Sequence, residues 1–238
     1  MDEIIPLRQI ESNTDFLFGQ LLLINKPLNW TSFDVVNKVR YTIKHRLDIK
    51  KIKVGHAGTL DPLATGLIIL ATGKMTKRIM ELQGLDKTYI GSIKFGGSTP
   101  TYDAEMEVDQ PAVYDHITEE ILINARDLFL GEIEQIPPIF SALKKNGVPA
   151  YKLARQGKEV VMKKRNVTIS QYDLSNINLP DVDFEISCSK GTYIRSLAHD
   201  LGLACNSRAY LSKLVRTKID HFDLKDAWDL EELINALK

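Results

Sequence analysis

Residues 55–66 read Gly55-His56-Ala57-Gly58-Thr59-Leu60-Asp61-Pro62-Leu63-Ala64-Thr65-Gly66. This stretch separates a basic segment from a short apolar run at residues 67–70. Its glycines permit positive φ angles and close approach of the backbone, which is typical of a loop that holds something rather than of a spacer. Asp61 is the one carboxylate that the stretch contains, and Pro62 biases it away from helical geometry.

Asp61 is open to two interpretations. A single Asp presented on a glycine-rich loop is a candidate nucleophile or general base. The alternative is structural, with Asp61 as the N-cap of a one-turn helix that begins at Pro62. The chemistry of these residues leaves both interpretations open.

The apolar pattern around this loop predicts interspersed strands and helices. We expect strands over residues 20–25, 67–71, 87–95, 167–174 and 182–188, and helices over residues 74–82, 117–130, 192–204 and 230–237. Thr31 followed by Asp34 indicates a further helix start, whereas residues 211–219 fit either state. Asn146-Gly147 between two short runs predicts a hairpin. Because strands and helices do not alternate strictly, we predict an α+β fold with a mixed or antiparallel sheet.

Composition limits the classes of function. The chain of 238 residues suits one large domain or two small ones, and residues 1–19 are patterned weakly enough to be an N-terminal extension. The 31 basic residues balance 31 acidic ones, which argues weakly against nucleic-acid binding. Basic residues nevertheless gather within residues 44–53 and 144–165, where they could follow phosphates or simply form solvated faces.

The compartment is also constrained. Cys188 and Cys205 are the two cysteines in the sequence, and no metal-ligand spacing is present, so we expect neither a disulfide framework nor a metal site. The N-terminus lacks the basic region and apolar core of a signal peptide. No apolar run reaches the length of a membrane helix. We therefore expect a cytoplasmic protein.

Several segments, met in chain order, carry a resemblance to a known family. They are residues 22–27 (LLINKP), 55–66, 86–89 (DKTY), 99–103 (TPTYD), 135–138 (QIPP), 141–144 (SALK), 188–195 (CSKGTYIR) and 214–216 (LVR). Together they extend over about residues 20–220, and they resemble the TruB family of tRNA pseudouridine synthases. The loop at residues 55–66 is similar to the signature loop of that family.

The resemblance implies an isomerase that converts uridine 55 in the T-loop of tRNA to pseudouridine. This reaction breaks the C1′–N1 bond, turns the base and joins C1′ to C5, so it needs no redox cofactor. By resemblance, Asp61 is the essential nucleophile or base and Arg195 is its charged partner. Whether Asp61 attacks C1′ or removes a sugar proton stays open.

The resemblance also assigns stacking on the flipped base to Tyr89, the pocket lining to Tyr193 and insertion into the RNA to His56. Leu214 would complete the apolar wall, and Lys26, Lys77 and Lys144 are candidate phosphate contacts. Thr101 and Asp103 resemble a family loop that supports the site.

The resemblance further predicts architecture and partners. Residues 20–238 are expected to form the catalytic domain, a long curved sheet flanked by helices. Because the chain ends a few residues past the last matching segment, we expect no C-terminal PUA domain. We also expect a monomer that recognises the T-arm of tRNA and has no membrane partner.

Two other classes of function are weighed against this one. A non-catalytic RNA-binding module on the same scaffold would be favoured by loss of Asp61, Tyr89 or Arg195, and all are present. An enzyme acting on a small sugar or phosphate would be expected to show a second catalytic carboxylate or a phosphate-binding helix start, and neither is evident. Dyskerin-like relatives guided by a small RNA carry the PUA domain, so this short chain fits them poorly.

Overall fold

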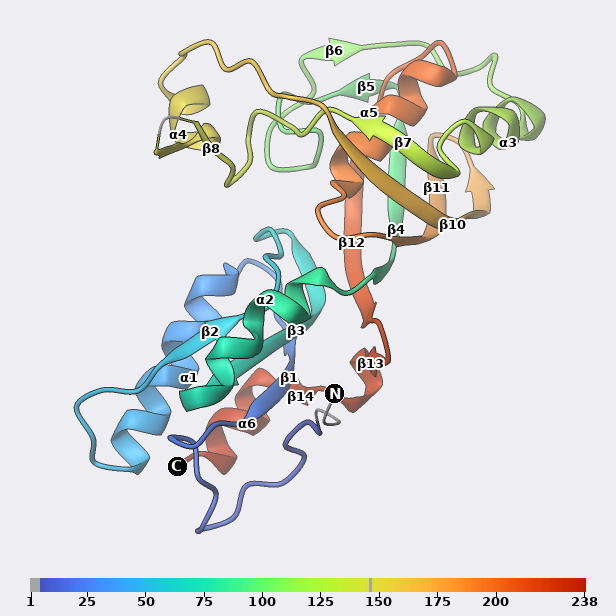
Figure 1. The fold of residues 1–238 in the computed structure, drawn as a ribbon. Helices are drawn as coiled ribbons and strands as arrows, with labels where there is room; N and C mark the ends of the chain where they lie inside the picture. Colours follow the sequence, from blue (N-terminus) through green and yellow to red (C-terminus); the bar gives the residue numbers. More distant parts are fainter. Residues whose placement is uncertain (1–4, 146) are drawn as a thin grey trace. The chain divides into compact units, whose positions relative to one another are not determined.

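The computed structural model describes residues 5–145 and 147–238, which form two compact units (Figure 1). The first unit is built from both ends of the chain, up to Tyr89 and over Val215–Lys238, and the second is Ile90–Leu214. Both boundaries fall inside strands, β4 (Lys87–Phe95) and β12 (Ala209–Ile219), and not in linkers. For this reason no change of composition marks them in the sequence.

The first unit contains strands in the order β14-β1-β3-β12. These are β14 (Trp228–Asp229), β1 (Leu21–Lys26), β3 (Ala64–Thr72) and the end of β12, with β2 (Val54–His56) beside β3 and β13 (Phe222–Asp223) beside β12. β1 runs antiparallel to β3, with Leu21 opposite Ala71, and parallel to β14. The sheet is therefore mixed, as the sequence predicts.

Both faces of this sheet are buried, which explains the continuous apolar runs of β1 and β3. Leu22 and Ile24 face one hydrophobic cluster, with residues of α1 (Ser32–Arg46) and α6 (Leu230–Ala236). Leu21 and Leu23 face another cluster, which includes Leu82 of α2 (Ile79–Gly84). Successive side chains of a strand point to opposite faces, so one run of leucines and isoleucines contributes to both clusters.

The helix starts of the first unit follow local chemistry. Thr31 caps α1 as part of a capping box with Asp34, and this confirms the predicted start. The Asp229 side chain caps α6 by accepting hydrogen bonds from the backbone N–H groups of Glu231 and Glu232. The predicted helix at residues 74–82 is divided in the structure into a 3-10 helix, η1 (Gly73–Arg78), and α2. A second short 3-10 helix, η2 (Leu224–Asp226), follows β13.

The second unit contains strands in the order β12-β4-β11-β10-β7. These strands include β11 (Asp181–Cys188), β10 (Arg165–Asn178) and β7 (Gly131–Gln135). The helices α3 (Glu119–Asp127) and α5 (Ile194–Ala204) belong to the same unit. The register of β10 against β11 shifts between Ile169 and Gln171. Because a shift of one residue exchanges the faces of a strand, the buried positions change from Val167 and Ile169 to Tyr172.

Two small hairpins and a short helix complete this unit. β5 (Gly97–Ser98) pairs with β6 (Gln110–Pro111), and β8 (Lys144–Lys145) pairs with β9 (Val148–Pro149) just before α4 (Ala150–Arg155). The β8–β9 pair confirms the hairpin that Asn146-Gly147 predicts, although Asn146 itself lies outside the described residues. Within the described part of the chain, no helix has the length and apolar character that crossing a membrane requires.

Candidate active site

Asp61 lies in the loop that joins β2 to β3, two antiparallel neighbours of the first unit. It begins a tight turn, because the backbone N–H of Ala64 donates to the Asp61 carbonyl at 3.1 Å and Pro62 occupies the second position. No helix begins at Pro62, so the N-cap interpretation of Asp61 is wrong. The carboxylate stands on a turn and is half-buried.

Ser32 and Leu60 hold the loop from the side of α1. The Ser32 hydroxyl donates to the Leu60 carbonyl at 3.0 Å and accepts from the Leu60 N–H at 2.8 Å. Ser32 is the first residue of α1, and the Leu60 side chain is buried. The residue immediately before Asp61 is therefore fixed through both of its backbone polar groups.

Lys26, the last residue of β1, holds the other side of the turn. Its ammonium donates to the carbonyls of Pro27 at 2.9 Å, Trp30 at 2.6 Å and Pro62 at 3.4 Å. The side chain is fully buried, at 0% exposure, so this arrangement does not favour the predicted contact of Lys26 with an RNA phosphate. The sequence could not reveal this burial, because Lys side chains are normally exposed.

Arg216 lies outside this loop but supports it, and the sequence analysis did not identify that role. It lies in β12, is 1% exposed, and donates to the Leu67 carbonyl at 2.7 Å and the Gly58 carbonyl at 3.2 Å. Gly66 has a φ of +103°, and a side chain there would collide with the Arg216 backbone. The matching segment at residues 214–216 was the available signal, although it does not indicate which residue supports the loop.

The charges around the turn favour an ionised Asp61. Burial lowers the pKa of Lys26 to about 8, while the charge of Asp61 opposes that decrease and the charge of Arg216 adds to it. Lys26 therefore stays mostly protonated at pH 7 and shares the site with a second cation. Cations near a carboxylate stabilise its charged form.

The other predicted residues of the first unit lie on different elements. His56 ends β2 and is half-buried, and burial lowers its pKa, which favours the neutral imidazole at pH 7. Lys77 is exposed on η1. Tyr89 is a buried residue of β4.

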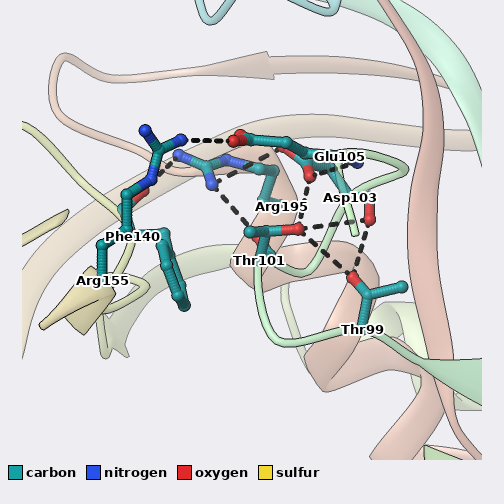
Figure 2. A network of polar contacts seen from close by, with 7 residues as sticks. All are labelled: Thr99, Thr101, Asp103, Glu105, Phe140, Arg155 and Arg195. Carbon is teal, nitrogen blue, oxygen red and sulfur yellow. Dashed lines mark hydrogen bonds and ion pairs between the residues drawn. The ribbon is translucent and has the colours of Figure 1, made fainter. Parts of the chain in front are cut away.

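Arg195 of the second unit is held in a buried polar network (Figure 2). Its guanidinium donates to the carbonyls of Thr101 and Phe140, each at 3.0 Å, and lies 3.6 Å from the Asp103 carboxylate. The Thr101 hydroxyl donates to the same carboxylate at 2.6 Å, and Thr99 donates to the Asp103 carbonyl at 2.6 Å. The loop that the resemblance assigns to support of the site therefore contacts Arg195 directly.

Tyr193 is held beside Arg195 by contacts with the end of β7. Gln135, which is 1% exposed, donates to the Tyr193 carbonyl at 3.1 Å and accepts from the Tyr193 N–H at 2.8 Å. The Arg165 guanidinium lies 4.5 Å from the centre of the Tyr193 ring. Leu214 is a half-buried residue of β12. The predicted pairing of Asp61 with Arg195 joins residues of different units and stays a prediction.

Comparison with known proteins identifies the family. A family model described as the N-terminal domain of TruB family pseudouridylate synthases matches residues 44–194, more than half of the chain. The chain belongs to the TruB family. A tRNA pseudouridine synthase B of Flavobacterium johnsoniae is 51% identical over 91% of this chain and 95% of its own length. Another, from Chloroherpeton thalassium, is 44% identical over 92% of this chain and 90% of its own length.

Solved structures share the fold of this chain. A chain of a Cbf5-Nop10-Gar1 complex has a TM-score of 0.68 at 28% identity, over 92% of this chain and 54% of that chain. A chain of an H/ACA RNP bound to a substrate RNA containing 2′-deoxyuridine has a TM-score of 0.64 at 26% identity, over 92% and 53%. This chain thus spans about half the length of those structural neighbours.

Membership of the TruB family confirms three predictions. The chain is a pseudouridylate synthase and therefore an isomerase, and its mixed sheet with flanking helices is the expected α+β fold. The individual roles of the site residues are not decided by these similarities.

Proposed function

We propose that this chain is a tRNA pseudouridine synthase that isomerises uridine 55 in the T-loop. The observation that carries the proposal is the Asp61 turn, whose backbone is held by Ser32 at Leu60, Lys26 at Pro62 and Arg216 at Gly58. The chain is also 51% identical to a relative named tRNA pseudouridine synthase B. A preorganised carboxylate is what cleavage of the C1′–N1 bond requires, because it must be aimed at the sugar before reaction.

In the proposed reaction, Asp61 acts on the ribose as nucleophile or general base. Lys26 and Arg216 keep the carboxylate ionised and fix the turn from which it projects. Arg195, positioned by Thr101, Asp103 and the Phe140 carbonyl, is the proposed charged partner of Asp61.

The uracil needs a pocket while it is detached and turned. Tyr89 is proposed to stack on the base, with Tyr193 and Leu214 as further walls. A base inside folded RNA must first be extruded at a cost of a few kcal/mol, and His56 is proposed to take its place in the loop. Lys77 is proposed to contact a phosphate. Lys26 is proposed to support the turn in place of binding substrate, because it is buried.

The test is pseudouridine mapping of tRNA incubated with the purified protein and with its Asp61→Asn variant. We expect modification at uridine 55 by the wild type. Asp61→Asn should lose more than about a thousandfold in rate, equivalent to roughly 4 kcal/mol or more, with tRNA binding retained.

Asp229→Asn is the matched control, because it makes the same chemical change in the same unit and Asn still caps α6. Its rate should equal that of the wild type. A rate within tenfold of wild type for Asp61→Asn would remove Asp61 from the reaction, and modification at another uridine would refute the assigned position.

A further inference from the structure

A basic hollow of about 890 Å³ lies in the first unit, apart from the Asp61 turn. Arg40 and Lys44 of α1 line it, together with Lys50, Lys51 and Lys53 of the segment that joins α1 to β2. We propose that this basic hollow binds the sugar-phosphate backbone of the RNA substrate. The inference rests on the proposed function, because it takes tRNA as the substrate.

Among the described residues that line the basic hollow, every charged side chain is positive. Lys74 and Lys77 of η1 complete its basic lining, and no Asp or Glu is among the described residues that line it. Within residues 5–145 and 147–238, none of these basic side chains forms an ion pair. In a chain with 31 basic and 31 acidic residues, this is a local excess that intramolecular pairing does not explain.

The walls of the basic hollow are held in place. The Arg40 guanidinium donates to the Asn37 side chain and to the Val54 carbonyl, each at 2.9 Å. The backbone N–H of Gly73 donates to the Lys53 carbonyl at 2.9 Å, which ties the lysine segment to the start of η1. Lys44 also has a structural reason for its charge, because it lies in the last turn of α1. Lys50, Lys51 and Lys53 are exposed and have no such reason.

The shape and position of the basic hollow favour an RNA backbone over a small anion as its ligand. The positive charges come from three segments around a wide, open hollow, whereas a single phosphate needs only a few converging donors. Gly55 lines the hollow and directly precedes His56, the residue proposed to enter the RNA loop. An RNA strand that passes His56 would therefore continue along the positive charges of the basic hollow. Such a row of charges suits the regularly spaced phosphates of an RNA backbone.

The test is tRNA binding as a function of salt for the triple variant Lys50→Gln/Lys51→Gln/Lys53→Gln. We expect its Kd to rise about tenfold or more at low salt. The slope of log Kd against log salt should fall by about 2, since each neutralised phosphate contributes roughly 0.7–0.9 to that slope. Lys38→Gln is the control, because Lys38 is exposed on α1 and does not line the basic hollow. Its Kd should match the wild type.

The outcomes separate this inference from the proposed function. Unmodified tRNA after incubation with wild type would refute the function, whatever the binding data show. Normal modification by wild type, with equal Kd and salt slope for the triple variant, would overturn the inference about the basic hollow. A triple variant that loses binding of ATP, used as a free phosphate probe, but binds tRNA normally would overturn it as well. A parallel Kd on an isolated T-arm stem-loop identifies the phosphates, because a penalty there places them in the T-arm and a penalty with intact tRNA alone places them elsewhere.

Discussion

At the scale of single residues, burial decides the role of Lys26. An exposed lysine next to a proposed RNA site would be read as a phosphate contact, whereas Lys26 is 0% exposed and bound to three carbonyls. Burial lowers its pKa to about 8 and the charge of Asp61 offsets part of that decrease, so Lys26 stays mostly protonated at pH 7. The same side chain thus satisfies backbone acceptors and supplies positive charge to the carboxylate.

Lys26→Met tests this structural role. Methionine fits the buried stem but leaves acceptors such as the Trp30 and Pro62 carbonyls without their donor, so we expect about 1–3 kcal/mol of lost stability by urea unfolding. The rate of pseudouridine formation should fall because the Asp61 turn loosens. The salt slope of tRNA binding should equal that of wild type, and a reduced slope would restore Lys26 to the phosphate contacts.

At the scale of elements, the Asp61 turn is positioned by the first residue of a helix. The capping box of Thr31 and Asp34 sets where α1 begins, and this places Ser32 against Leu60. A local signal in the sequence therefore positions a side chain that fixes a loop 28 residues further on. The helix start therefore stabilises the loop through Ser32, and we expect the same contact to aim Asp61.

Ser32→Ala tests separately whether this contact stabilises the fold and whether it aims Asp61. It removes both hydrogen bonds to the buried Leu60 backbone without changing the cap, and we expect a loss of about 1–3 kcal/mol in stability. The single-turnover rate should fall more than the affinity for tRNA, because aiming of Asp61 is lost and RNA contacts are kept.

Thr118→Ala is the control for stability alone. Thr118 caps α3 in the second unit, and its loss should cost about 1 kcal/mol with the rate unchanged. If Ser32→Ala lowers stability and leaves the single-turnover rate at the wild-type value, the Ser32–Leu60 contact does not aim Asp61.

At the scale of the whole molecule, zero net charge conceals separate basic regions. The basic hollow belongs to the first unit, while residues 144–165, which include β8 and α4, form a basic segment of the second. Arg155 pairs with Glu105 and Lys164 with Glu134, so part of that second charge is internally compensated. We therefore expect the first unit to contribute more of the salt-dependent binding.

An isolated T-arm stem-loop should be a good substrate for this chain, and tRNA binding should weaken steeply as salt rises. His56→Ala should slow single-turnover modification of intact tRNA more than of a stem-loop whose loop is already opened, because the imidazole is proposed to replace the extruded base. Rates on both substrates at two salt concentrations check this. Binding that ignores salt, or a strict need for the anticodon arm, would contradict recognition through the T-arm.

The sequence by itself determined the features that depend on neighbouring residues. The Thr31–Asp34 cap, the β4 strand over residues 87–95 and the loop around Asp61 are all specified within short segments. The ordered motifs were sufficient for the family, because a family pattern is itself a property of contiguous residues.

Only the tertiary structure decided the contacts that join distant segments. Arg216 bonds to Gly58 across 158 positions, and Arg195 bonds to Thr101 across 94. No local periodicity encodes such pairs, because burial and partner choice arise only when separate elements pack together. The division into two units was hidden for the same reason, since its boundaries run through the middle of β4 and β12.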